Sequence, residues 1–203
     1  MKMRSVSLSL LTFCLLAAVP ALADTLYSTL PYNGNTNAHN LLSPWAVSDP
    51  ILVPTNSDIE TLTIVYWDSS STDLLSTVQM AISSSALPVS GFETLTPTSS
   101  TIEGTNIHGL YVVEANFTFP VIDYSGAGWI TLEHATCSSP CSILWDQNGA
   151  TLNSKASNGG APTSIDGESF SLGGEIAPEP SSLLLLGTGL LGMAGMLRRK
   201  LAR

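Results

Sequence analysis

The stretch Val113-Glu114-Ala115-Asn116-Phe117-Thr118-Phe119-Pro120-Val121 alternates apolar and polar residues along its whole length. This two-residue period is that of a β-strand with one face in a core and the other in water. The same period recurs in the runs 61–67, 77–83 and 169–173. No run in the central part of the sequence has a helical period with capping residues. The sequence therefore predicts an all-β fold.

Short clusters of Gly, Ser, Asn and Asp lie outside these runs and predict turns. They occur at residues 33–35, 68–73, 124–128 and 156–160. Many short strands joined by such turns are typical of a β-sandwich. We therefore expect a single β-sandwich domain, jelly-roll-like, over residues 24–174.

The N-terminal segment predicts a secretory signal peptide over residues 1–23. Two basic residues precede a short apolar stretch, and Ala21 and Ala23 then form the small-x-small pattern that signal peptidase accepts. Cleavage after Ala23 would leave Asp24 as the first residue of the mature chain. The expected partners at this end are the Sec translocon and signal peptidase.

The C-terminal segment predicts a transmembrane helix. Residues 181–197 carry no charge and are just long enough to span a bilayer as a helix. Four basic residues follow, namely Arg198, Arg199, Lys200 and Arg203. Because positive charge beside a span stays in the cytoplasm, this end is expected inside the cell and the domain outside.

Pro178-Glu179-Pro180 stands directly before the apolar span. The order of Pro-Glu-Pro, a span rich in Leu and Gly, and an Arg-rich end resembles the PEP-CTERM sorting signal, which we place at residues 175–203. Such signals belong to exopolysaccharide-producing Gram-negative bacteria. The resemblance implies recognition by an exosortase, a membrane-embedded cysteine transpeptidase thought to cut near the motif. Two prolines favour the extended chain that a protease needs. We expect residues 173–177 to be a short linker to this signal.

The predicted domain is strongly acidic. Residues 24–177 hold fifteen of the sixteen acidic residues and only one of the seven basic residues, Lys155. Such a surface repels nucleic acid and anionic lipid, so neither is an expected partner of the domain. The charge suits a soluble extracellular protein.

Two cysteines of the domain, Cys137 and Cys141, lie between two predicted strands, 129–134 and 142–146. Export to an oxidising compartment favours a disulfide between them, closing the loop of a hairpin. The loop is small, so the expected stabilisation is at the low end of the usual range. A zinc site formed with His134 is the alternative, but it lacks a fourth ligand and the usual spacing.

No catalytic motif stands out in the sequence. The three histidines occupy no nucleophile elbow, zinc-binding helix motif or paired-ligand spacing. We therefore expect a protein that is not an enzyme. A glycan hydrolase remains the alternative, because Glu114, Glu133 and Asp146 could converge in space as catalytic carboxylates.

Four tryptophans are candidates for stacking on sugar rings: Trp45, Trp67, Trp129 and Trp145. Trp129 and Trp145 flank the predicted hairpin and are the preferred pair, although core packing is the alternative for each. No cofactor is predicted. A structural calcium ion is left open, because Asp68 and Asp73 flank a Ser-rich turn and calcium prefers oxygen ligands.

Three short segments, 128–132, 144–149 and 167–173, resemble the closing strands of β-sandwich domains in other PEP-CTERM proteins. Those domains are similar in shape to carbohydrate-binding modules, a likeness of fold that does not fix function. We expect an inner-membrane-anchored precursor and then a cell-surface or extracellular-matrix protein. Its expected setting is exopolysaccharide or biofilm, with weak glycan binding as its molecular role.

Overall fold

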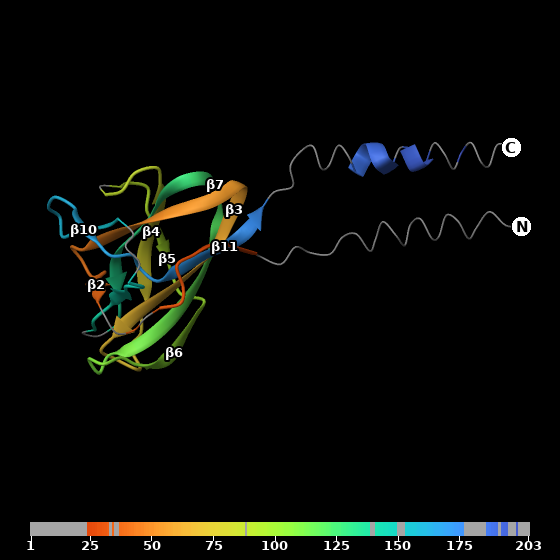
Figure 1. The fold of residues 1–203 in the computed structure, drawn as a ribbon. Coiled ribbons are helices and arrows are strands. Elements are labelled where there is room, and N and C mark those ends of the chain that lie inside the picture. Colours follow the sequence, from red (N-terminus) through yellow and green to blue (C-terminus); the bar gives the residue numbers. More distant parts are fainter. Residues whose placement is uncertain are drawn as a thin grey trace, which may run out of the picture.

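The computed structural model describes residues 24–32, 34, 37–87, 89–138, 141–149, 153–176, 186–190, 192–194 and 198. Its strands are β1 (Asp24–Ser28), β2 (Ala38–Asn40), β3 (Ala46–Asp68), β4 (Thr77–Ser83), β5 (Glu93–Leu95), β6 (Ser99–Thr105), β7 (Tyr111–Thr136), β8 (Leu144–Asp146), β9 (Ser154–Ser157), β10 (Thr163–Ile165) and β11 (Phe170–Ile176). The strand pairs are antiparallel and belong to one sheet (Figure 1), which confirms the predicted all-β fold.

Two long strands, β3 and β7, form the central pair of the sheet. They pair along almost their whole length, from Ala46 opposite Glu133 to Asp68 opposite Tyr111. Other strands add to this ribbon in two groups. The half with β3 residues 46–53 is flanked by β9 and β4, and the half with residues 57–68 by β11 and β6.

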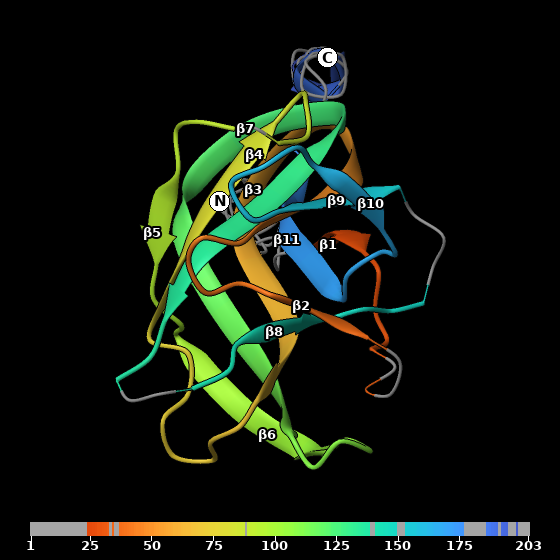
Figure 2. The same ribbon diagram turned by 90° about the vertical axis from the view of Figure 1, so that its left-hand side faces the viewer.

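The β3–β7 ribbon bends between these two halves. Its register shifts between Val53 and Ser57, and Asn56 and Gly126 have φ angles of 59° and 84°. A bulge with positive φ turns a strand sharply, and glycine adopts that conformation without strain. Figure 2 shows β7 turning over at the top of the molecule, so one sheet folds over itself.

One hydrophobic core lies inside the folded sheet. It joins residues of both halves, among them Val47, Ile130 and Leu132 from one and Ile64 and Phe117 from the other. The alternation in 113–121 holds up to Phe119, whereas Val121, predicted to face inward, is 56% exposed at the bend. Burial of these side chains drives the fold, because each removes apolar surface from water.

Three local predictions were wrong. Residues 124–128 do not end a strand but lie inside β7, where the ribbon bends. The expected hairpin of 129–134 and 142–146 does not form, because β8 pairs with β2 and β3 instead of β7. The expected linker at 173–177 is largely strand, because β11 continues to Ile176 in pairing with β3.

The first and last strands of the domain are neighbours. β1 pairs antiparallel with β11, and Asp24 lies directly opposite Gly174. The chain therefore enters and leaves the domain at the same corner, where β1 begins and β11 ends (Figure 1).

Candidate functional site

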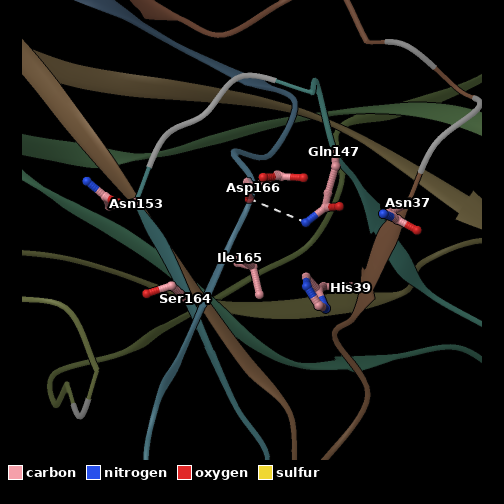
Figure 3. A pocket seen from close by; sticks show the side chains of 7 residues that line it. All are labelled: Asn37, His39, Gln147, Asn153, Ser164, Ile165 and Asp166. Carbon is pink, nitrogen blue, oxygen red and sulfur yellow. Dashed lines mark hydrogen bonds between the residues drawn. The ribbon is translucent and has the colours of Figure 1, made fainter.

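A polar cavity of about 430 Å³ opens where residues in or beside β2, β8, β9 and β10 come together. It is lined by Asn37, His39, Gln147, Asn153, Ser164, Ile165 and Asp166 (Figure 3). Apart from Ile165, the lining consists of amide, imidazole, hydroxyl and carboxyl side chains. These groups donate and accept hydrogen bonds, so the cavity suits a ligand rich in hydroxyl groups.

The chain holds Gln147 firmly at the wall of this cavity. Its side chain is 3% exposed, and its Nε2 donates to the main-chain oxygen of Asp166 at 3.4 Å (Figure 3). Its main-chain nitrogen donates to the oxygen of Asn37 at 3.0 Å. These bonds tie together the loops after β8 and β10 and the segment before β2, so three separate parts of the chain build the wall.

His39 contributes an uncharged imidazole. It lies on β2 opposite Trp145 and is partly buried. Burial lowers the pKa of His39, and the nearby carboxylate of Asp166 opposes this only in part. The neutral ring has one donor and one acceptor nitrogen near pH 7.

Three fully buried carboxyl groups, of Asp49, Asp146 and Glu168, lie close to this region. Asp49 Oδ2 accepts hydrogen bonds from Ser154 Oγ at 2.8 Å and from the main-chain nitrogen of Glu168 at 2.6 Å. Asp146 Oδ2 accepts one from Ser169 Oγ at 3.0 Å. Serines and one amide thus compensate part of the cost of burying these groups.

Burial shifts two of these carboxyl groups, Asp49 and Glu168, toward their protonated forms. Burial raises the pKa of Asp49 to about 6, although its bonds from Glu168 and Ser154 act in the opposite direction. The pKa of Glu168 is raised well above its usual value, first by burial and then by the charge of Asp49, with Gln147 opposing. The shift has this direction because taking a carboxylate out of water is costly.

One buried oxygen of this group, Asp49 Oδ1, makes no hydrogen bond to the described residues. Within the described part of the chain, no three His, Cys, Asp or Glu side chains are grouped to hold a metal ion. The carboxyl groups therefore offer an acidic interior beside the cavity without a recognisable ion-binding set.

The tryptophans are placed differently from the prediction. Trp145 is fully buried beside Phe170, and its Nε1 donates to the oxygen of Ser169 at 3.1 Å. Its ring faces are covered, so the predicted sugar stacking by Trp145 is wrong. Trp67 is also buried. Trp129 and Trp45 are partly exposed, and stacking by Trp129 stays a prediction.

Cys137 and Cys141 are joined by a disulfide in the structure. Both sulfurs are used in this bond, which leaves no thiolates for the alternative zinc site with His134. The bridge closes the connection between β7 and β8, which do not pair with each other although both pair with β3.

Asp68 and Asp73 both accept hydrogen bonds from main-chain nitrogens of the domain. Asp68 Oδ1 accepts from the main-chain nitrogen of Ser70 at 2.9 Å, and Asp73 Oδ1 from that of Ser138 at 2.9 Å. These bonds organise the turn after β3 and connect it to the disulfide segment. They give the two carboxylates a structural role in this part of the domain.

The three carboxyl groups considered for glycoside hydrolysis do not form a set. Glu114 lies opposite Val65 and Glu133 opposite Ala46, in the two different halves of the ribbon. Asp146 is fully buried. A hydrolase needs two carboxyl groups flanking one bond, and these residues do not provide that arrangement.

The predicted processing residues lie mostly outside the described residues. This holds for Ala21 and Ala23, for Pro178, Glu179 and Pro180, and for Arg199, Lys200 and Arg203. Residues 186–190 and 192–194, within the predicted span, are helical, and Arg198 is described. Among the residues that the structure describes, no helix is long and apolar enough to cross a membrane.

The chain is thus an all-β domain followed at once by a separate C-terminal segment. That segment, residues 177–200, matches the PEP-CTERM protein-sorting motif. The match identifies a protein with a PEP-CTERM sorting domain and indicates an exported precursor that an exosortase processes. Neither the curated proteins nor the solved structures yield a match to the chain.

Proposed function

We propose that this chain is a non-enzymatic cell-surface or extracellular-matrix protein that an exosortase releases from its membrane-bound tail. The match of residues 177–200 to the sorting motif carries this proposal. The acidic all-β domain that precedes it fits an extracellular setting, since high net charge keeps a protein soluble.

The corner where β1 begins and β11 ends supports this topology. The predicted signal peptide precedes Asp24, and the sorting motif follows Ile176. Pairing of β1 with β11 therefore lets the domain fold while both apolar segments remain in one membrane.

Deleting the exosortase gene of the producing bacterium tests the proposal. In wild-type cells, the mass of the mature C-terminus should correspond to a cut near Pro178-Glu179-Pro180. In the deletion strain, full-length protein with Arg203 should stay in the membrane fraction. Unchanged processing and location in the deletion strain would contradict the proposal.

A second function, weak binding of exopolysaccharide, is supported by the polar cavity lined by His39, Gln147, Ser164 and Asp166. Its volume suits one or two sugar residues, and its amides, hydroxyl and carboxyl can pair with sugar hydroxyls. An imidazole that stays neutral near pH 7 adds a donor and an acceptor.

Affinity electrophoresis in gels containing the producer's own polysaccharide tests this binding. We expect retardation of the wild-type domain and loss of retardation in a His39→Ala, Asp166→Asn double variant. Asp123→Asn removes an exposed carboxylate at the bend of the ribbon and is the matched control. Equal retardation of all three proteins would place the binding elsewhere, with Trp129 the next residue to change.

The same preparation separates a binding protein from a glycan hydrolase. A non-enzymatic protein should leave the chain length of the polysaccharide unchanged after long incubation. Release of oligosaccharides by the wild-type domain, abolished in a variant of a single carboxyl group, would favour the hydrolase.

A further inference from the structure

The sorting motif leaves almost no spacer after the folded domain. β11 stays paired with β3 up to Ile176, and the matched motif begins at residue 177. A fully extended residue spans at most about 3.6 Å, so Pro178 lies within roughly 7 Å of the end of the sheet. An enzyme that binds Pro178 would meet the folded domain at once.

The last two residues of β11 are held on one side only. β1 reaches no further than Asp24, which lies opposite Gly174. Beyond that point, Glu175 pairs with Asp58 and Ile176 with Ser57, both on β3. In the described part of the chain, Glu175 and Ile176 therefore form an unprotected edge of the sheet.

This edge also carries unfavourable charge. Asp58 lies directly opposite Glu175 on one side and Asp123 on the other, so three carboxylates follow one another across β11, β3 and β7. Like charges directly opposite one another destabilise strand pairing. Ile176 is 51% exposed and regains little by burial.

A bulge separates this edge from the rest of β11. The register shifts between Gly173 and Gly174. A Cβ atom at residue 174 would overlap the main-chain oxygen of Asp58, so only glycine fits this close approach. β11 is tightly packed against β3 at Gly174 and weakly paired beyond it. The end of β11 can therefore separate from β3 after Gly174.

We propose that Glu175 and Ile176 detach from β3, with Gly173 and Gly174 as the hinge, and so provide the sorting enzyme with extended chain before its motif. This inference rests on the proposed sorting function. Detachment moves the last paired residue back to Gly174 and lengthens the free chain before Pro178 to roughly 14 Å. Local opening of a strand end with few buried contacts costs little free energy.

A disulfide that locks the edge tests the inference. Asp58→Cys with Glu175→Cys places cysteines at directly opposite positions, with Cβ atoms about 4.5–5.5 Å apart, close to what a disulfide needs. The matched control is Asp58→Ser with Glu175→Ser, which removes the same charges without a bridge. Peptide mass mapping should show the new bridge beside the one between Cys137 and Cys141.

In producing cells, the locked precursor should lose its tail at least about tenfold more slowly than the serine control in a pulse-chase experiment. A flexible four-residue insertion after Ile176 should restore processing of the locked chain. Processing of the locked chain at the control rate would overturn the inference, and so would failure of the insertion to restore it. If the sorting proposal itself is wrong, even the wild-type chain keeps its tail in cells with the enzyme.

Discussion

Two groups of carboxylates on either side of the bend in β3 have opposite surroundings. Asp49, before the bend, is fully buried next to Glu168 and its pKa is raised to about 6. Asp58, after the bend, is half-buried and lies in a row with the exposed Asp123 and Glu175. The same residue type on one strand thus has a costly interior position and a mildly unfavourable surface position. The comparison teaches that burial, rather than the number of neighbouring charges, determines the energetic cost.

The largest expected effect comes from neutralising the buried group. Asp49→Asn keeps an oxygen for the bonds from Ser154 and Glu168 but removes the buried charge. At pH 7.5 we expect the free energy of unfolding to rise by roughly 3 kcal/mol. Urea unfolding measures this change.

The same substitution should flatten the pH dependence. The folded-state pKa of Asp49 is raised, so its protonation stabilises the fold below pH 4, and this contribution is lost as the pH rises through about 6. The gain from Asp49→Asn should therefore vanish near pH 4. Asp58→Asn is the control on the same strand, and an equal gain there would break the comparison. The pKa of His39 is lowered, so its contribution to stability is lost as the pH falls, opposite to that of Asp49. The quantity to compare is therefore the difference in unfolding free energy between each variant and the wild type at the same pH.

Removing a partner of the buried group should have the next largest effect. Ser154→Ala deletes the hydroxyl that donates to Asp49 Oδ2 at 2.8 Å. We expect a loss of about 2 kcal/mol at pH 7.5, because a hydrogen bond to a buried charge is stronger than a neutral one. Thermal and urea unfolding at pH 7.5 and pH 4 measure it. A loss of the same size at both values would show that the bond does not depend on the charge of Asp49.

Removing one charge from the row of Asp123, Asp58 and Glu175 should stabilise the domain slightly, whereas Ser154→Ala destabilises it. Asp58→Asn removes the central charge between Asp123 and Glu175. We expect a gain in stability of about 0.5 kcal/mol or less and slower amide hydrogen exchange at Ile176. Faster exchange at Ile176 would contradict the view that like charges loosen this edge.

Salt should reduce the stability gain of Asp58→Asn and leave the stability gain of Asp49→Asn unchanged. The benefit of Asp58→Asn should fade between about 0.01 and 1 M sodium chloride, because ions screen exposed charges over these distances. The benefit of Asp49→Asn should persist over the same range, since ions do not enter the interior. Parallel urea titrations check both. An equal salt dependence would mean that Asp49 is accessible to solvent.

The sequence predicted the strand class because side-chain alternation reports directly on a surface with one wet face. Phe117 and Phe119 follow that rule. The same reasoning missed the bend. A glycine such as Gly126 predicts a turn between two strands, whereas in the structure β7 continues through it. It also missed the end of β11, since Gly173 and Gly174 resemble a linker in sequence and serve as a bulge in the sheet.

The candidate site was less predictable. His39, Gln147 and Asp166 come from three distant segments and form no motif, so only the fold brings them together. The burial of Asp49 and Glu168 was also invisible, because acidic residues are usually exposed. The sorting segment was predictable for the opposite reason: its order of motif, span and charges is local and needs no partner elsewhere in the chain.

The turn at residues 106–110 stands at the far end of the long ribbon from the bend (Figure 2). From Tyr111 to Tyr124, β7 rises by about 3.3 Å per residue, which places this turn roughly 40 Å above the corner that faces the membrane on the proposed topology. Asn106 Oδ1 accepts from the main-chain nitrogens of His108 and Leu110, and Ile107 is 72% exposed. In the membrane-bound precursor, the exposed side chain of Ile107 would therefore lie at the end of the ribbon that points away from the membrane.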